Sequence, residues 1–166
     1  DNKIFEGLDL NYELLCKAII NVDPVTTPGL IGPAPWNNRL IAYISEGEFE
    51  GPKMKGKVLP GGGDWIRMDP NRPNARIADV RAVWETDDGA KIYLYYTGRI
   101  ITPETPEGED PVDDSTRDPS EYYFTVSPNF ETADSRYAWL NDIIVVGVGR
   151  MLPGGVAYNM YHTNNL

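Results

Sequence analysis

Apolar and polar residues alternate along most of this chain, and glycine or proline interrupts the alternation at short intervals. The stretch DVRAVWETDDGAKIYLYYTG, residues 79–98, shows the pattern: two alternating runs flank Asp88-Gly89. Successive side chains of a strand point to opposite faces, so a period of two indicates strands and a period of 3.6 indicates helices. No long stretch keeps the helical period. The sequence therefore predicts an all-β protein.

Short strands separated by turns predict an antiparallel meander, and closing it into a barrel removes the exposed strand edges. With 166 residues and no internal repeat, we expect one domain over residues 1–166, a single closed or nearly closed antiparallel β-barrel of eight to nine strands with long loops. The candidate strands are Tyr12–Val22, Arg39–Phe49, Lys53–Leu59, Asp64–Met68, Ile77–Thr86, Lys91–Ile101, Tyr122–Val126, Leu140–Val148 and Val156–His162.

Two segments break the pattern. Residues 23–38 are rich in proline and glycine, and we expect them to cross one end of the barrel. Residues 102–121 hold four prolines and contribute −7 to the net charge of −10, because eight of them are acidic and only Arg117 is basic. This composition favours a solvated loop over a functional lid. Its acidic stretch EDPVDDSTRD, residues 109–118, lacks the glycine and the ligand spacing of an EF-hand calcium loop.

Several functional classes have no support in the sequence. No cluster of Lys and Arg is present to neutralise phosphates, so we expect no nucleic-acid partner. No run of eighteen apolar residues is present, so we expect no membrane span. Cys16 is the only cysteine, which excludes an intrachain disulfide and fits a cytoplasmic location. The chain begins at Asp1 without a Met, so a removed leader stays open.

Cofactor and metal sites are equally unsupported. One His and one Cys cannot supply the usual zinc ligands, and no serine lies in a G-x-S-x-G motif. GVGRMLPGG follows a strand without opening a helix, and it meets neither common nucleotide-loop spacing. We expect no metal and no cofactor, so an enzyme of this sequence would work with its side chains alone.

The Asp88-Gly89 turn allows a prediction of register. A two- or four-residue loop pairs positions whose numbers sum to 177. One face then mixes charged, aromatic and aliphatic side chains, as a ligand cavity in a small barrel does. In the other interpretation this face is solvated and its arginine pairs with a neighbouring carboxylate. The face carries Asp79, Arg81, Val83 and Glu85 opposite Gly98, Tyr96, Leu94 and Ile92.

A second cluster of candidate residues lies in SPNFETADSRYAWLNDIIVVGVGRM, residues 127–151. Alternation places Trp139 and Asn141 on one face of a strand, and Phe130 and Tyr137 precede them. The segment is either the rim of a cavity or the anchor of one strand, and we favour the rim. Tryptophans such as Trp65 are core candidates first and ligand-stacking surfaces second.

Four stretches together resemble family 3237 of the domains of unknown function: GEFEGPKMKGKVLPGGGDWIRM, ADVRAVWETDDGAKIYLYYTGR, EYYFTVSPNFETADSRYAWLNDIIVVGVGR and VAYNMYH. The resemblance covers residues 13–162. It implies a compact antiparallel β-barrel, similar in outline to calycin and allene-oxide-cyclase barrels, and it implies no settled activity. The matched positions are Gly62 to Trp65, Arg81, the TDDGA turn and residues 130–141, whereas Glu85 and Tyr96 depart from the family's pattern.

The leading hypothesis is a cofactor-free isomerase, cyclase or lyase of small, oxygenated, largely apolar molecules. Arg81 and Tyr96 would polarise an oxygen atom, and Asp64 or Glu85 would move a proton. The alternatives are a carrier that uses the same cavity and a purely structural subunit. We expect a small hydrophobic or aromatic ligand, and an apolar exterior of Trp84, Tyr93 and Tyr95 that can support a homodimer. The predicted ligand-contacting residues are Trp65, Asp79, Phe130, Tyr137, Trp139 and Asn141.

Overall fold

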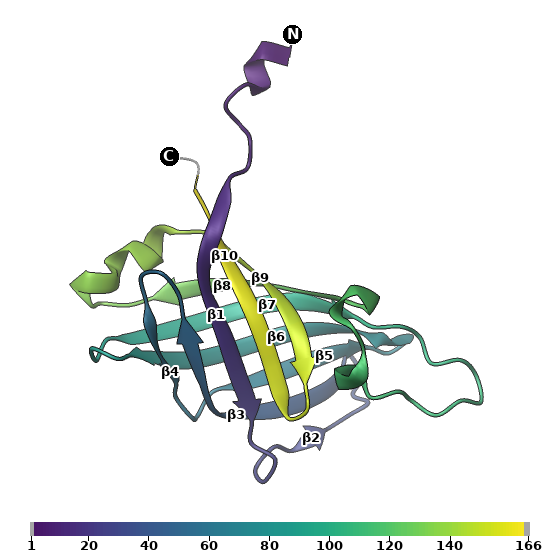
Figure 1. Cartoon of the computed structure of the whole chain (residues 1–166). Coiled ribbons are helices and arrows are strands. Elements are labelled where there is room, and N and C mark those ends of the chain that lie inside the picture. Colours follow the sequence, from purple (N-terminus) through teal and green to yellow (C-terminus); the bar gives the residue numbers. More distant parts are fainter. Residues whose placement is uncertain (1, 165–166) are drawn as a thin grey trace.

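The computed structural model describes residues 2–164, and within them the strands form a closed antiparallel barrel of eight strands with two additional strands (Figure 1). The strands are β1 Tyr12–Val22, β2 Gly29–Leu30, β3 Asn38–Glu50, β4 Lys55–Val58, β5 Gly63–Asp69, β6 Arg72–Thr86, β7 Lys91–Ile101, β8 Tyr123–Glu131, β9 Val145–Leu152 and β10 Gly155–Thr163. Strands that follow one another in the sequence pair around most of the barrel, and pairing of β3 with β1 closes it. β4 and β5 occupy successive parts of the space between β3 and β6, and β2 pairs only with β3.

The helices are short 3-10 turns outside the barrel wall: η1 Asn2–Phe5, η2 Asp114–Thr116, η3 Pro119–Glu121 and η4 Ser135–Asp142. None of the helices within residues 2–164 has the length and apolarity needed to cross a bilayer. The segment that carries η1 is exposed and extends away from the barrel (Figure 1).

The all-β barrel predicted from the alternation is confirmed, and the bounds of β1 and β7 agree with the sequence prediction. The strand predicted at Leu140–Val148 is wrong in its first half, because η4 occupies that region and β9 begins only at Val145. Asp134 caps η4 by accepting a hydrogen bond from the Arg136 backbone N–H at 3.0 Å. This cap stabilises a helical turn where alternation alone predicted extended backbone.

The register predicted for the β6–β7 hairpin is also wrong. The loop holds three residues, because the Thr86 backbone N–H donates to the Ala90 carbonyl at 2.9 Å and Gly89 takes a φ of 92°. A left-handed glycine at the third loop position is typical of such hairpins. The true pairs, such as Val80 with Tyr96, are one residue away from the predicted ones. A shift of one residue along β7 moves each of its side chains to the other face of the sheet relative to β6. Tyr96 therefore points into the barrel, whereas Arg81 points outward.

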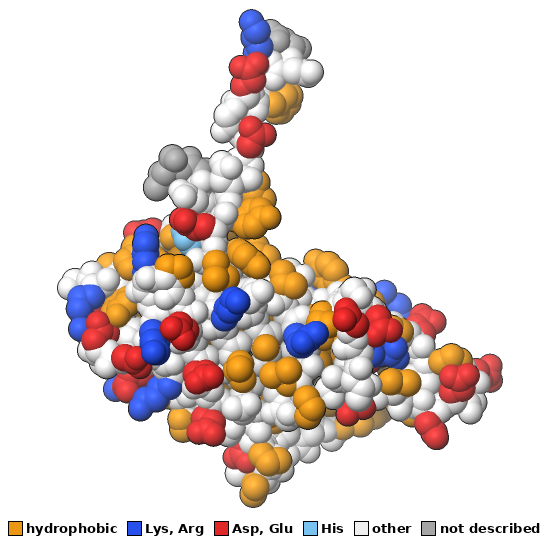
Figure 2. Space-filling model, viewed as in Figure 1, with side chains coloured by type: hydrophobic (Ala, Val, Ile, Leu, Met, Phe, Trp, Pro, Cys, Tyr) orange, Lys and Arg blue, Asp and Glu red, His pale blue; other side chains and the backbone are white. Residues whose placement is uncertain are grey.

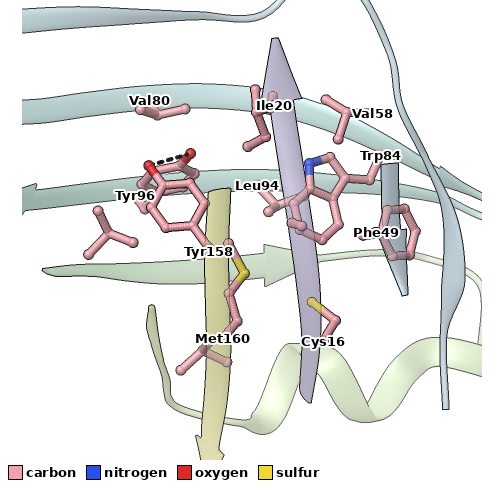
Figure 3. Packing of buried hydrophobic residues seen from close by; sticks show 14 of the residues in the cluster. Cys16, Ile20, Phe49, Val58, Val80, Trp84, Leu94, Tyr96, Tyr158 and Met160 are labelled. Carbon is pink, nitrogen blue, oxygen red and sulfur yellow. Dashed lines mark hydrogen bonds between the residues drawn. The ribbon is translucent and has the colours of Figure 1, made fainter. Parts of the chain in front are cut away.

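Buried apolar side chains pack inside the barrel, and aromatic rings fill the half that holds Trp84 and Phe49 (Figure 3). Trp84 is fully buried, stacks on Phe49 with ring centroids 4.5 Å apart and meets the edge of Phe130. Trp84 therefore does not belong to an apolar exterior, although a homodimer through other outer residues stays a prediction. Cys16 belongs to the same core, and burial raises the pKa of its thiol to about 12.

The β1–β3 seam requires a glycine where the two backbones meet. A Cβ at Gly47 would overlap the carbonyl oxygen of Ile19. We expect Gly47→Ala to lower the free energy of unfolding by about 1–3 kcal/mol, because the seam must open to admit the methyl group. Urea denaturation measures the change, and Glu48→Ala, at the next and exposed position of the seam, is the control. Equal losses in the two variants would contradict close backbone packing at Gly47.

Candidate functional site

The other half of the barrel interior holds a cavity of about 420 Å³. It opens toward the end of the barrel where residues 112–115 of the acidic loop lie. Its walls are mainly aliphatic and aromatic, and few polar side chains point into them, as in small-molecule sites generally. The buried apolar residues of the wall are Ile20, Ile44, Ile66, Val80, Ile100 and Phe124.

Asp64 brings a carboxylate to this apolar wall. It lies on β5, where it pairs with Ala42 of β3 and Val80 of β6, and it accepts a hydrogen bond from the Asp79 backbone N–H at 2.9 Å. Burial disfavours the charged form and raises the pKa of Asp64 to about 6, despite this hydrogen bond. A carboxyl group with a pKa near 6 can both accept and donate a proton close to neutral pH.

Two tyrosines face the same cavity from opposite sides of the barrel. Tyr96 of β7 and Tyr158 of β10 are buried, with their hydroxyl oxygens 3.5 Å apart and their rings edge to face (Figure 3). Burial raises the pKa of both phenols, so both stay protonated at neutral pH. The pair shares one of its two protons, which leaves the second available to an oxygen atom in the cavity.

Glycines on β9 make room for these rings. Gly147 and Gly149 face inward, where most strands of the barrel carry a side chain. A Cβ at Gly149 would lie 2.8 Å from atoms of the Phe124 ring, and Phe124 in turn packs edge to face on Tyr158, with ring centroids 5.4 Å apart. The small residues of β9 thus fix where the aromatic side of the cavity lies.

The mouth of the cavity combines a strand residue with the acidic loop. Arg76 enters from β6, and its Nη2 lies 4.0 Å from Oδ2 of Asp114 in η2. Arg117 holds the other oxygen of Asp114 at 3.0 Å from its Nε. Part of the loop predicted to be solvated therefore lies against the barrel at the mouth, while red acidic side chains spread over the outer part on the right of Figure 2.

The sequence pattern of the family described as "Protein of unknown function (DUF3237)" matches residues 11–163. The chain belongs to this family. It is 35% identical to a UPF0311 protein of Clostridium acetobutylicum over 157 residues, 92% of this chain and 94% of that protein. It is 36% identical to a UPF0311 protein of Rhodopseudomonas palustris over 132 residues, 76% of this chain and 78% of that protein. The resemblance seen in the sequence is confirmed.

Three solved structures share the barrel of this DUF3237 chain. A protein with unknown function from Clostridium acetobutylicum superposes with a TM-score of 0.76 at 31% identity, over 94% of this chain and all of that one. A beta-barrel like protein from Acinetobacter baumannii gives 0.77 at 30% identity, over 94% and 97%. An enzyme from Penicillium herquei gives 0.65 at 19% identity, over 93% and 95%, and shares the fold.

Of the candidate catalytic residues in this DUF3237 chain, Asp64 and Tyr96 line the cavity, whereas Arg81 and Glu85 do not. Arg81 lies outside, with its Nη1 3.4 Å from Oδ1 of Asp79 and its guanidinium 4.9 Å from the centre of the Tyr95 ring. Glu85 forms ion pairs with Lys57 and Lys91 at 3.9 and 3.3 Å. The face that carries Arg81 and Glu85 is therefore an ion-paired outer surface of the barrel, as in the alternative interpretation of the sequence.

The remaining candidate ligand contacts also lie away from the cavity. Trp65 points outward from β5 beside Tyr43, and Phe130 belongs to the packed half.

In the segment after β8, the Tyr137 hydroxyl donates a hydrogen bond to the Asp88 carboxylate at 2.9 Å, and Trp139 lies under the Lys53 ammonium. The Asn141 side chain bonds to the backbone N–H and carbonyl of Thr132 at 2.9 and 3.0 Å. These contacts anchor the segment to the barrel, the alternative to a cavity rim.

Sequence reasoning missed Tyr158 and Arg76. Alternation along β10 indicates that Tyr158 shares a face with Met160, yet nothing local indicates that Tyr96 lies opposite, 62 residues earlier. Arg76 precedes the strand predicted at Ile77, so its inward direction was not apparent. Within residues 2–164, no group of three His, Cys, Asp or Glu side chains is placed to hold a metal ion.

Proposed function

We propose that the cavity is the active site of a cofactor-independent isomerase, cyclase or lyase acting by acid/base catalysis on a small, oxygenated, largely apolar molecule. The observation that carries the proposal is Asp64, whose pKa burial raises to about 6 at an apolar wall beside the Tyr96–Tyr158 pair. A desolvated carboxyl group next to hydrogen-bond donors inside a cavity is a typical arrangement for proton transfer.

The proposed reaction begins with Asp64 ionised. Its carboxylate removes a proton from a carbon next to a carbonyl group, and the carbonyl oxygen gains negative charge. A hydroxyl of the tyrosine pair donates a hydrogen bond to that oxygen, which stabilises the enolate. The protonated Asp64 then returns the proton to another atom in an isomerisation or cyclisation, or to a leaving group in a lyase reaction. The apolar walls keep water away from the intermediate.

The proposal can be tested without knowing the net reaction, because proton abstraction exchanges a carbon-bound hydrogen for solvent deuterium. We expect the protein to speed deuterium incorporation into one or more members of a panel of small aromatic and alicyclic ketones and keto acids in D2O. The rate should rise with pH through about 6 and then level off, because Asp64 must be ionised to act as the base. Mass spectrometry of the recovered compounds measures the exchange.

Tyr96→Phe and Tyr95→Phe form a matched pair for this assay. Each removes one phenol oxygen from β7, but only Tyr96 lines the cavity, whereas Tyr95 lies under Arg81 outside. We expect Tyr96→Phe to slow exchange by roughly 10²-fold, the usual cost of losing one donor to a developing oxyanion, and Tyr95→Phe to leave it unchanged. Equal rates in both variants would remove the tyrosine pair from the mechanism.

A carrier without turnover is the second candidate, favoured by the predominance of apolar residues in the cavity wall. A carrier should keep its ligand through purification, so its native mass should exceed its denatured mass. It should also exchange no deuterium in the same panel. An occupied cavity with no exchange activity would favour the carrier over the enzyme.

A further inference from the structure

We propose that the ligand of this cavity is an aromatic carboxylic acid, whose carboxylate binds Arg76 at the mouth and displaces Asp114 from it. The binding step stands on the residues of the mouth, and its use in catalysis rests on the proposed function.

Arg76 is an incompletely satisfied cation at the entrance of an apolar cavity. Its side chain is 29% exposed, and its only ion pair among residues 2–164 is the contact of 4.0 Å with Asp114. Its Nε is buried and has no hydrogen-bond partner within the described chain. A guanidinium binds a carboxylate best through two parallel, shorter hydrogen bonds, which Asp114 does not supply at this distance. A free carboxylate entering the mouth can make those two bonds.

Asp114 can give up Arg76 without losing its own partner. Its Oδ1 already accepts a hydrogen bond of 3.0 Å from Nε of Arg117, whose side chain is 18% exposed. The partly buried charges at the mouth are thus two cations, Arg76 and Arg117, and one anion, Asp114, while the carboxylate of Glu104 beside them is exposed. Asp113 is exposed and uses its carboxylate to accept bonds from the backbone N–H and hydroxyl of Ser115. The partly buried side chains of the mouth therefore carry one more positive than negative charge, which favours the binding of one further anion.

The distance from Arg76 to the tyrosines and Asp64 sets the size of the ligand. In the β5–β6 ladder Arg76 pairs with Met68, and Asp64 lies four residues further along β5. Four residues of strand span roughly 13 Å, part of which the arginine side chain covers. A ligand that joins the two ends has about the length of a phenylpropanoid or a fused bicyclic acid, and a cavity of about 420 Å³ can hold one. Its ring would lie against the isoleucines of the wall.

Matched ligands that differ only in charge test the proposal. The probes are 3-phenylpropionate, 3-phenylpropanamide and 3-phenylpropylamine, with 2-naphthylacetate and its amide as a bicyclic pair, titrated into the full ¹⁵N-labelled chain by NMR. We expect each carboxylate to bind at least about tenfold more tightly than its amide and to shift the Nε–Hε signal of Arg76. Equal affinities, tighter binding of the amine, or no binding of either carboxylate up to its solubility limit would overturn the proposal.

Two charge-matched variants locate the contact. Arg76→Gln should abolish the preference for carboxylate over amide, whereas Arg81→Gln should keep it, because Arg81 lies on the same strand but faces outward. Asp114→Asn removes the competing carboxylate and should tighten carboxylate binding severalfold. A preference that survives Arg76→Gln would overturn the assignment of Arg76.

Asp64→Asn separates this inference from the proposed function. The variant should still prefer carboxylates, because Asp64 lies at the other end of the ligand. If carboxylates bind but neither the wild type nor the variant exchanges deuterium, the carboxylate site stands and the enzyme proposal fails. If the wild type exchanges deuterium without any carboxylate preference, the enzyme proposal stands and the carboxylate site fails.

Discussion

Asp64→Asn is expected to make the protein more stable at pH 8 and far less active. The pKa of Asp64 is raised to about 6 in the folded state, above its value of 3.8 in an unfolded chain. The stability associated with the neutral carboxyl group is therefore present below pH 4 and lost as the pH rises through 6. A rise of this size corresponds to at most about 3 kcal/mol. Asparagine is neutral at every pH, and its side-chain oxygen can still accept the hydrogen bond from Asp79.

We therefore expect Asp64→Asn to raise the free energy of unfolding by about 1–3 kcal/mol at pH 8 and to leave it nearly unchanged at pH 4. Urea denaturation at both pH values measures the difference. Any proton-transfer activity should fall by roughly 10²–10⁴-fold, because asparagine cannot act as the base. Glu85→Gln, on the outer face beside Lys57 and Lys91, is the control for activity. If Asp64→Asn were less stable than the wild type at pH 8, the charge of Asp64 would be stabilising. If Asp64→Asn kept full activity, Asp64 would be excluded as the base.

If Asp64 lowers stability but is needed for activity, its position in the apolar wall is explained by function and not by folding. A carboxylate at an apolar wall costs folding free energy, and a neutral residue of the same shape would avoid that cost. Residues that weaken the fold without a compensating contact are common at functional sites. The hydrogen bond from Asp79 offsets only part of the cost, since the pKa stays raised.

The barrel could be predicted from the sequence because strand alternation reports burial directly. Along β7, buried residues from Ile92 to Ile100 alternate with more exposed ones. Only short-range information is needed to read such a pattern, and closure follows from the cost of leaving strand edges unpaired. The helix η4 was not predicted because it depends on specific hydrogen bonds and not on a periodic pattern of apolar residues. These are the cap at Asp134 and the hydrogen bond from the Thr132 backbone N–H to the Asn141 side chain.

The candidate site was only half predictable, because one residue of loop length decides which side chains enter the barrel. Asp88-Gly89 is compatible with loops of two, three or four residues, and only the three-residue loop puts Tyr96 inside and Arg81 outside. The residues that complete the cavity, Tyr158 and Arg76, come from a distant strand and from an extension of β6. Their convergence is a property of the closed barrel and has no local signal.

The same closure divides the interior into two parts with different roles. Large rings fill the half around Trp84, while aliphatic side chains line the space around Asp64 and the glycines of β9 seat Phe124 and Tyr158 beside it. Rigid packing in one half can hold the strands of the other half in register, so that the carboxyl group and the tyrosines keep their positions. The stability of the barrel should then depend mainly on the packed half.

Trp84→Ala is accordingly expected to lower the free energy of unfolding by about 3–5 kcal/mol, the range for deleting a large buried aromatic side chain. Trp84 is fully buried between Phe49 and Phe130, so its removal leaves a void that the closed strands cannot readily collapse into. Its indole Nε1 has no hydrogen-bond partner within the described chain, which already costs stability. Trp84→Phe removes that donor while keeping a ring, and we expect it to lose much less stability than the alanine variant.

Trp36→Ala is the control, because Trp36 is 88% exposed and its loss should change stability by no more than about 0.5 kcal/mol. Urea denaturation followed by circular dichroism measures all three variants without relying on tryptophan fluorescence. A Trp84→Ala barrel as stable as Trp36→Ala would show that the filled half does not hold the fold, and the register around Asp64 would then need another source of support.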